Sequence, residues 1–352
     1  MKVKRRVDEM RALTRLAVVF AVFAPMSAVI GADQDAAATR AAFLQIIDRP
    51  QVPLSGQVQS STQANGIVQE RFTYATEAGL RIPGVLTKPA AGAIRRPVVI
   101  ALHGTGDSKE GLLGLLQAFS NQGFVAVAID ARYHGEHLQR GSGDYIDAIF
   151  LAYRTGYGHP LLYDTVWDVM RLVDYTATRP DVDATRIGLT GISKGGMETY
   201  LTSAVDPRIA VAVPMIGVQS FRWGLDHGAW QSRVETFQGA VDAAAGEAGS
   251  HVDASFVRKF YDRVVPGIYG RFDGPVMLPL IAPRPLLVIN GDSDARTPLP
   301  GVRECADAAS LAYKAAQAED RFTLYVQANT GHAITPQAAQ TAVAWFVKWL
   351  KP

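Results

Sequence analysis

Short apolar runs alternate with amphipathic segments along most of this chain. Residues 97–102 (PVVIAL) and 124–129 (FVAVAI) are apolar throughout, which is typical of strands buried on both faces of a parallel sheet. Similar patterns predict further strands at residues 68–74, 81–87, 186–190, 209–215, 285–290 and 322–326. Helical spacing of apolar residues predicts helices at residues 112–122, 163–178, 195–204 and 341–350. This order predicts an α/β fold with a mostly parallel central sheet and helices on both faces.

The alternation of strands and helices stops between Gly217 and Pro283. Residues 218–283 are rich in aromatic side chains, and we interpret them as a helical, cap-like insertion. Because the chain must return to the same sheet afterwards, we expect one domain over residues 33–352. The insertion should cover the carboxyl edge of the sheet, where open α/β sheets place their binding sites. Trp223 and Trp230 are its candidate substrate-binding residues, although tryptophan also fills protein cores.

The first residues are interpreted separately from the domain. Basic residues precede an apolar run at residues 16–24, and small residues follow Pro25. A basic head, a short apolar stretch and a small-residue exit are typical of a secretory signal peptide. Even extended to residue 32, the apolar stretch is marginal for spanning about 30 Å of hydrocarbon. We therefore predict a signal peptide at residues 1–32 and export to the periplasm or the extracellular space, with a membrane anchor as the alternative.

Removal of this segment changes the charge of the chain. The full sequence has 35 Lys and Arg against 33 Asp and Glu, a net charge of +2. Residues 1–32 hold six of the basic and two of the acidic residues, so the remainder carries −2. The apparent basicity thus belongs to the predicted signal, and the sequence shows no basic patch for nucleic acid. Cys305 is the only cysteine, which excludes an internal disulfide, and its alanine-rich surroundings predict a buried structural thiol on a helix.

A Gly-x-Ser-x-Gly pattern occurs at residues 191–195, between a predicted strand and a predicted helix. In this context a serine sits on a tight strand–turn–helix elbow, and a side chain at Gly191 or Gly195 would collide with adjacent elements. The elbow also places the backbone N–H of Lys194 beside a developing oxyanion. We predict Ser193 as a nucleophile and Lys194 as an oxyanion-hole residue.

A serine hydroxyl needs a base, and the elbow fold requires the chain order serine, acid, histidine. His332 follows the last predicted strand and is the predicted general base. The loop after the strand at 285–290 offers two carboxylates, Asp292 and Asp294. We predict Asp294 as the acid because it lies deeper in the loop, and Asp292 is the alternative.

The second oxyanion-hole donor should follow the first buried strand, at residues 103–106 (HGTG). We predict the N–H of Thr105, with Gly106 as the alternative, and expect His103 to organise the loop. His134 and His137 flank Glu136, but no helical His-Glu-x-x-His pattern is present, so no metal site is predicted.

Taken together, these residues resemble the α/β-hydrolase superfamily. The resemblance covers about residues 68–350 and is strongest to the branch of dienelactone hydrolases and acetyl xylan esterases, which borders the catalytic domain of prolyl oligopeptidases. Dienelactone hydrolases use a cysteine where this chain has Ser193, so the resemblance does not imply that activity. It rests on six motifs in order: residues 103–104, 130–135, 191–196, 281–287, 291–298 and 331–332.

The sequence therefore predicts a secreted serine hydrolase that cleaves carboxylic esters through a Ser-His-Asp triad and an acyl-enzyme. Acetyl or other acyl esters of carbohydrates are candidate substrates, and no cofactor, no nucleic-acid partner and no stable membrane insertion after signal cleavage are expected. A peptidase or amidase of the prolyl-oligopeptidase-like group is the first alternative, but the sequence identifies no group that would hold peptide termini. A non-catalytic binding module is the second, and such a module would normally lack a triad residue.

Overall fold

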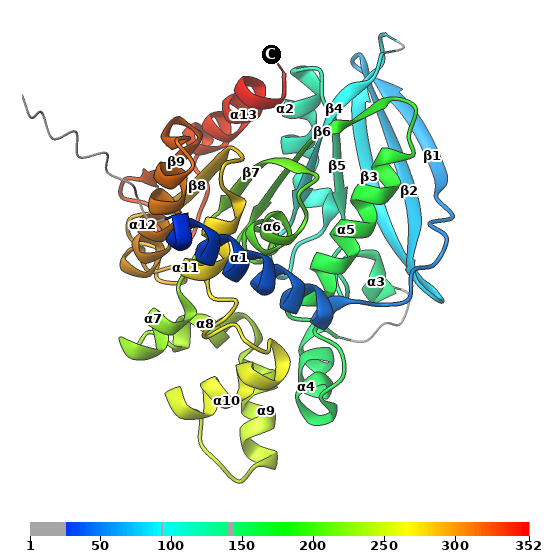
Figure 1. Cartoon of the computed structure of the whole chain (residues 1–352). Helices are drawn as coiled ribbons and strands as arrows, with labels where there is room; N and C mark the ends of the chain where they lie inside the picture. The colour runs from blue at the N-terminus through cyan, green and yellow to red at the C-terminus, as the bar shows by residue number, and fades with distance from the viewer. Residues whose placement is uncertain (1–25, 93, 140–143, 352) are drawn as a thin grey trace, which may run out of the picture. The chain divides into compact units, whose positions relative to one another are not determined.

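The computed structural model describes residues 26–92, 94–139 and 144–351 (Figure 1). The chain divides between Ala38 and Thr39 into two units, and helix α1 (Met26–Ile47) contains residues of both. The predicted signal peptide at residues 1–32 lies mostly outside the described residues and stays a prediction. None of the described helices is both long and apolar enough to cross a membrane.

The second unit is built on one sheet, whose described strands have the order β1-β2-β3-β5-β4-β6-β7-β8-β9. β1, β2, β3 and β5 pair antiparallel in that order, and all remaining neighbours are parallel. This arrangement confirms the predicted, mostly parallel sheet. The strands are β1 (Gln57–Ala64), β2 (Ile67–Glu77), β3 (Leu80–Pro89), β4 (Arg96–Leu102), β5 (Val125–Ile129), β6 (Val182–Ile192), β7 (Ile209–Met215), β8 (Leu286–Gly291) and β9 (Phe322–Gln327).

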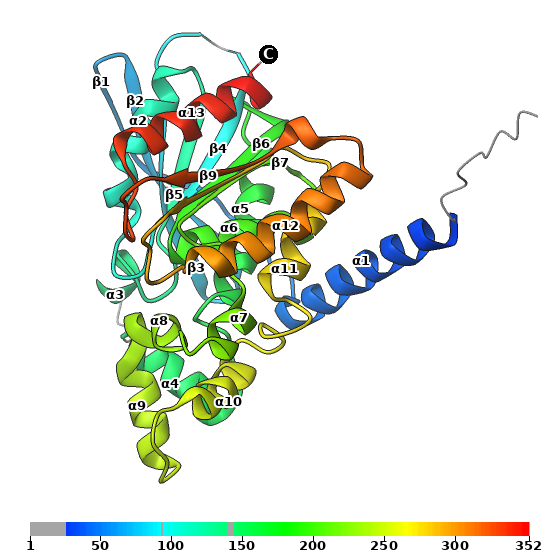
Figure 2. The same ribbon diagram turned by 90° about the vertical axis from the view of Figure 1, so that its left-hand side faces the viewer.

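Helices cover both faces of this sheet, as the two perpendicular views show (Figures 1 and 2). Alternate residues of β4 point to opposite faces, so Val98 and Ile100 join one buried cluster and Val99 joins the other. α5 packs into the first cluster, and α2 and α13 pack into the second. The helices outside the insertion are α2 (Leu113–Asn121), α3 (Glu136–Gln139), α4 (Tyr145–Thr155), α5 (Tyr163–Ala177), α6 (Lys194–Val205), α12 (Leu299–Ala315) and α13 (Pro336–Leu350).

The segment between β7 and β8 is helical and contains no strand among its residues, all of which the structure describes. Its helices α9 and α10 contact α4, one of three helices between β5 and β6 in the chain, and together they lie beyond one end of the sheet (Figures 1 and 2). The helices of this segment are α7 (Phe221–Asp226), α8 (Gln231–Val234), α9 (Gln238–Glu247), α10 (Ala254–Val264) and α11 (Gly274–Met277), with short 3₁₀ turns at Glu235–Phe237 and Leu278–Ile281.

Several elements, among them β1 and α4, were missing from the sequence-based prediction. β1 is exposed at every position and pairs only with β2 at the edge of the sheet, so its sequence has no buried face to produce an alternating pattern. α4 begins after Asp144, whose side chain accepts a hydrogen bond from the N–H of Ile146, and ends at Gly156 in a left-handed conformation. These residues are ordinary helix start and stop signals. Cys305 lies on α12 and is fully buried, as predicted.

Candidate active site

Ser193 lies between the end of β6 and the first residue of α6. Its backbone has φ 57° and ψ −114°, a combination that side-chain-bearing residues adopt only at a cost of order 1–3 kcal/mol. Its N–H donates to the carbonyl of Met215 at 2.9 Å, and its own carbonyl accepts from the N–H of Met197 at 3.0 Å. The strained turn is therefore held by the neighbouring strand β7 and by the first turn of α6.

Glycine is required around this turn because backbone atoms lie too close for a side chain. A Cβ on Gly191 would lie 2.2 Å from the carbonyl oxygen of Gly195, and one on Gly195 would lie 2.4 Å from that of Leu102. Neither backbone oxygen can move without displacing a buried strand or helix. The crowding expected from the sequence pattern at both glycines is confirmed.

Gly195→Ala is expected to destabilise the protein by about 1–3 kcal/mol, since it overpacks a site bounded by backbone. The matched control is Gly114→Ala on α2, where an added Cβ has no heavy atom within 4 Å. That change should stabilise the protein by roughly 0.5–1 kcal/mol, because alanine loses less backbone entropy than glycine in a helix. Urea unfolding of both variants measures the difference, and equal stabilities would contradict the crowding at Gly195.

Ser193, His332 and Asp294 form a continuous chain of hydrogen bonds. The Nε2 atom of His332 lies 2.8 Å from the Oγ atom of Ser193. Its Nδ1 atom lies 2.8 Å from Oδ2 and 3.0 Å from Oδ1 of Asp294. The three residues follow β6, β9 and β8, which are neighbours or near neighbours in the sheet and run parallel. The parallel order thus brings three distant positions of the sequence to one edge.

The carboxylate of Asp294 is buried and fully satisfied by donors. Oδ1 accepts from the backbone N–H groups of Arg296 at 2.8 Å and Thr297 at 3.1 Å, and Oδ2 accepts from the Thr297 hydroxyl at 2.6 Å. Burial alone would raise the pKa of Asp294, but the hydrogen bonds from His332 and Thr297 outweigh it and lower the pKa. An ionised Asp294 can accept a hydrogen bond from Nδ1–H of His332, which leaves Nε2 unprotonated and able to accept a proton from Ser193.

Asp292 has a different position. Its Oδ2 accepts from the N–H of Asn329 at 2.8 Å, and its Oδ1 accepts from the N–H of Thr330 at 3.0 Å. These bonds, with one from the Ser293 hydroxyl, lower the pKa of Asp292. Asp292 therefore fastens the loop that leads to His332 and does not contact the imidazole itself.

The loop that follows β4 packs directly against the elbow. A Cβ on Gly104 would lie 3.4 Å from the Cβ of Ser193, and Thr105 lines the same cavity as Ser193. His103 accepts the N–H of Ala131 at Nε2 (3.0 Å), so Nδ1 carries the proton and donates it to the carbonyl of Gly104 at 2.7 Å. His103 thus ties the end of β4 to the loop after β5, in the expected organising position.

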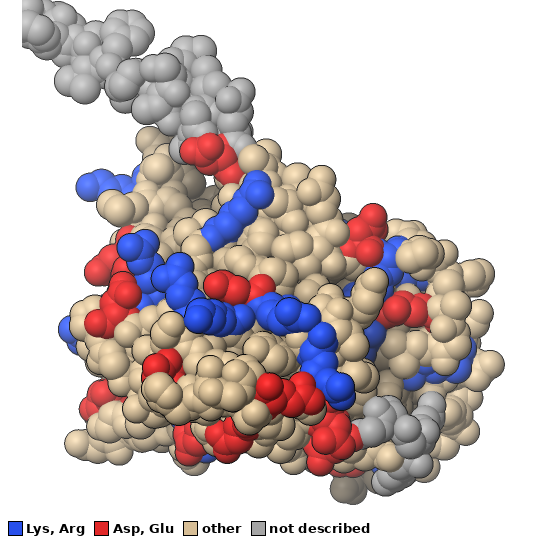
Figure 3. All heavy atoms as spheres, turned by 90° about the horizontal axis from the view of Figure 1, so that it is seen from below, with Lys and Arg blue, Asp and Glu red and all other residues tan. Residues whose placement is uncertain are grey.

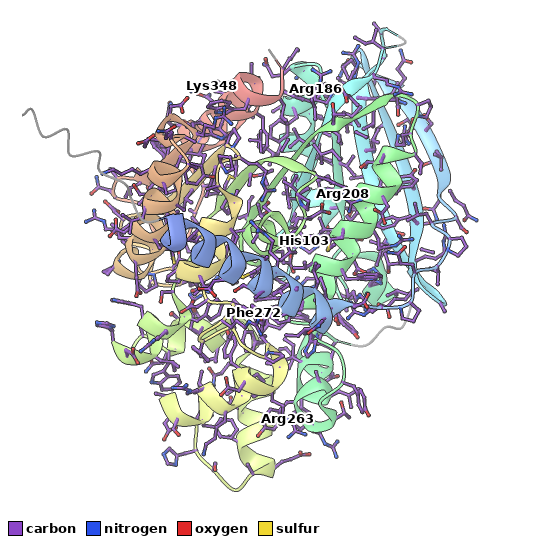
Figure 4. The ribbon with its side chains drawn as sticks, viewed as in Figure 1. His103, Arg186, Arg208, Arg263, Phe272 and Lys348 are labelled. Carbon is purple, nitrogen blue, oxygen red and sulfur yellow. The ribbon has the colours of Figure 1, made fainter. Side chains whose placement is uncertain are left out.

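His103 is held in its neutral form by its surroundings. Burial, and then the positive charge of Lys194, lower the pKa of His103 to about 4. In Figure 4 it lies in the centre of the molecule, far from Arg263 on α10. A neutral imidazole suits the hydrogen bonds that His103 makes, because a second ring proton would oppose the N–H of Ala131.

The side chain of Lys194 is also buried. Its ammonium group pairs with Glu198 one turn further along α6, lies 3.5 Å from the hydroxyl of Thr165 and lies 5.8 Å from the ring centroid of Tyr145. The backbone N–H of Lys194 belongs to the first turn of α6, where amides have no partner within the helix. The main chain of Lys194 is therefore the part available to an oxyanion.

The cavity at Ser193 is formed jointly by the sheet edge and the segment between β7 and β8. Trp223 and Trp230, predicted to bind substrate, do not line it. Trp223 instead stacks on His227, with ring centroids 4.4 Å apart, and packs against Gly301. The lining includes Thr105, Leu161, Leu162, Ser193, Lys194, Met197, Ile216, Ser232, Arg233, Thr236, Phe237, Tyr261, Arg296, Thr297 and His332.

Several of these lining residues were missed by the sequence analysis. Thr297 orients Asp294 through its hydroxyl and its N–H, and its position directly before Pro298 gave no signal of that role. Arg233 and Tyr261 lie in the irregular helical segment, where no strand–helix periodicity marks which side chains point inward. Within the described residues, no group of three or more His, Cys, Asp or Glu side chains could hold a metal ion.

Comparison with known proteins identifies relatives among hydrolases. YtaP of Bacillus subtilis is 26% identical over 65% of this chain and 66% of its own length. The 4-O-methyl-glucuronoyl methylesterase of Hypocrea jecorina is 26% identical over 75% of this chain. The chain spans only 54% of that enzyme's length.

Structural similarity extends over most of the chain. The acetyl xylan esterase from Paenibacillus sp. R4 superposes with a TM-score of 0.58 and 19% sequence identity, over 91% of this chain and 94% of that one. At this level of identity the likeness demonstrates a shared fold. The α/β-hydrolase fold, with its mostly parallel sheet, is therefore confirmed.

The comparison with family models identifies a family as well as a fold. Residues 76–317, more than half of the chain, match the family described as glucuronyl esterase, fungi. This match agrees with the predicted esterase branch and with a carboxylic ester hydrolase. The chain belongs to the glucuronyl esterase family of α/β-hydrolases.

Proposed function

We propose that this protein is an exported serine hydrolase that cleaves carboxylic esters of carbohydrates through an acyl-enzyme on Ser193. The observation that carries the proposal is the hydrogen-bonded chain from Ser193 Oγ through His332 to Asp294, with 2.8 Å at each of its two closest contacts. A nucleophile, a base and an orienting carboxylate at these distances are the elements of acyl transfer.

In the first half of the reaction, His332 Nε2 takes the proton of Ser193 as Oγ attacks the ester carbonyl carbon. The carbonyl oxygen becomes an oxyanion beside the N–H groups of Lys194 and Thr105, which stabilise the negative charge. His332 then gives its proton to the leaving alkoxide, which departs as an alcohol. Asp294 stabilises the imidazolium and fixes its orientation throughout.

The second half repeats the chemistry with water. His332 takes a proton from a water molecule as the water oxygen attacks the acyl carbon. The new oxyanion accepts hydrogen bonds from the same N–H groups. Collapse of this intermediate breaks the bond to Ser193 Oγ, which recovers its proton from His332. The carboxylic acid is released and ionises in solution. Every step uses side chains and amides of this chain, together with substrate and water.

Carbohydrate esters are the proposed substrate class because the family match and the relatives name such esters. Export is proposed because the basic head and apolar run at the N-terminus have the order of a signal peptide. The substrate class and export can each be tested directly. For export, expression with and without residues 1–32 followed by fractionation of the cells is sufficient, and retention of the full chain in the cytoplasm would reject it.

The proposed reaction predicts a clear order among model substrates. p-Nitrophenyl acetate, an acetylated xylo-oligosaccharide and the methyl ester of glucuronic acid represent activated, acetyl and uronoyl esters, and alanine p-nitroanilide represents an amide. We expect hydrolysis of at least one sugar ester, and kcat/KM for the anilide at least about 100-fold below that for p-nitrophenyl acetate, because an amide is a much less reactive acyl donor than an activated ester. Faster cleavage of the anilide than of every ester would favour a peptidase.

A further inference from the structure

Arg233 is a buried cation in the same cavity as Ser193. It lies on α8 in the segment between β7 and β8, is 7% exposed and lines the cavity together with Ser193 and His332. An arginine stays charged under all ordinary conditions. A buried charge is costly unless it is paired, so the contacts of Arg233 indicate its role.

No carboxylate of the described residues forms an ion pair with this guanidinium, and Asp294 attracts it only over a longer distance. In the part of the chain that the structure describes, Arg233 has no ion pair, and its only side-chain hydrogen bond runs from Nε to the hydroxyl of Ser232 at 3.1 Å. The terminal nitrogens Nη1 and Nη2 have no hydrogen-bonding partner among these residues. Burial lowers the pKa of Arg233, which indicates that the charged form is under-stabilised.

Aromatic rings surround Arg233 where acidic groups would be expected. The Phe221 ring centroid lies 5.9 Å from its guanidinium carbon, and Tyr261 donates its hydroxyl to the backbone carbonyl of Arg233 at 2.5 Å. Tyr261 in turn packs against Phe221 and Tyr269, with ring centroids 5.6 and 5.4 Å apart. The rings hold the arginine in place without forming an ion pair with it.

Other cations near this site are paired. Lys194 pairs with Glu198, and Arg296, at the cavity wall, lies 3.0 Å from Glu235. On the exposed surface of the same segment, Arg222 lies 3.6 Å from Asp226. Figure 3 shows acidic side chains beside basic ones on the face seen there. Arg233 therefore stands out among the charged residues that line the cavity.

We propose that Arg233 binds a carboxylate carried by the substrate, so that the preferred substrates are acyl esters of acidic molecules. The guanidinium has two free nitrogens, which match the two oxygens of a carboxylate. The bound carboxylate is separate from the ester that Ser193 attacks, and it supplies the missing countercharge. This inference rests on the proposed function, because it assigns the substrate class of the same site.

The kinetic test compares two acetyl esters that differ in charge, 3-acetoxybenzoate and its neutral methyl ester. We expect Arg233→Met to reduce kcat/KM for the anionic ester by roughly 10- to 100-fold, the range for a charge-assisted pair, and to change the neutral ester less than about 3-fold. Arg233→Lys should retain part of the preference, because lysine keeps the charge without the planar fork. Arg222→Met is the matched surface control and should alter neither ester. Equal losses on both esters in Arg233→Met would overturn the proposal.

Stability distinguishes a binding role from a structural one. Methionine has nearly the length of arginine without its charge, and replacing an unpaired buried charge with an apolar side chain is often neutral or stabilising. The melting temperature of Arg233→Met should therefore equal or exceed that of the wild type. A large decrease in melting temperature would assign Arg233 to the framework of the segment.

A binding experiment separates this proposal from the proposed function. Calorimetric titration of Ser193→Ala with benzoate and with benzamide, its uncharged analogue, requires no catalysis. We expect benzoate to bind at least about 10-fold more tightly, and Arg233→Met in the same background to remove the difference. If the wild type hydrolyses neither acetoxy ester but this difference is present, the proposed function fails and the carboxylate site stands. If the esters are hydrolysed and benzoate binds no more tightly than benzamide, the proposed function stands and the carboxylate site is rejected.

Discussion

Ser193→Ala is expected to lower kcat for p-nitrophenyl acetate by a factor on the order of 10⁴ to 10⁶. The change removes the only atom that can form the acyl-enzyme, while the N–H groups of Lys194 and Thr105 remain and support a small residual rate. His332→Ala should cause a loss of similar size, and the double variant should lose little more, since the residues act as a unit. The rate of p-nitrophenol release by the purified, folded variants measures these losses. Equal activity of Ser193→Ala and the wild type would reject the proposed nucleophile.

Ser193→Gly serves as a control for the fold and tests the strain at the elbow. Alanine retains the Cβ and hence the unfavourable φ of 57°, whereas glycine adopts such angles readily. Both variants should be inactive, but Ser193→Gly should be more stable than Ser193→Ala by about 1 kcal/mol, which is the strain less the extra entropy that glycine loses on folding. Identical melting temperatures would mean that the backbone at Ser193 is not strained.

The sequence was sufficient to predict the centre of the sheet and insufficient for its edge. β4 and β5 are buried on both faces and fully apolar apart from the first residue of β4, so burial is visible directly in the amino acids. β7 begins and ends at the predicted residues 209 and 215. β1 is polar and exposed, and only pairing with β2 makes it a strand. Tertiary hydrogen bonding of this kind leaves no periodic signal.

The candidate active site was also predictable from the sequence only in part. The order of Ser193, Asp294 and His332 follows from topology, because their strands end at one edge of a parallel sheet. The choice between Asp292 and Asp294 depends on how an eight-residue stretch folds against the loop of His332, and two carboxylates two residues apart cannot be separated by pattern. Arg233 gave no signal at all, since its importance lies in the absence of an acidic partner, which only packing reveals.

Asp294→Asn is expected to lower kcat by about 10⁴-fold, because an amide in place of the carboxylate favours the wrong tautomer of His332 and does not stabilise the imidazolium. Asp292→Asn is the matched comparison, two residues away in the same loop. It keeps one acceptor oxygen for the backbone of Asn329 or Thr330 and does not touch the imidazole, so its kcat should fall by less than about 10-fold, as expected for a group outside the hydrogen-bonded triad. Comparable losses in the two variants would remove the distinction between orienting the base and fastening its loop.

The pH dependence of protein stability provides a second test of Asp294. The pKa of Asp294 is lower in the folded protein than its ordinary value, so its ionised form stabilises the fold above the ordinary carboxyl pKa, and this stabilisation is lost as the pH falls through the folded value. The difference in unfolding free energy between wild type and Asp294→Asn should therefore be largest near neutral pH and shrink in acid. Urea unfolding at pH 7 and at pH values below the ordinary carboxyl pKa of 3.8 measures it. A difference that grows in acid would mean that Asp294 is protonated in the folded state, and a neutral carboxyl group could not orient His332 as the mechanism requires.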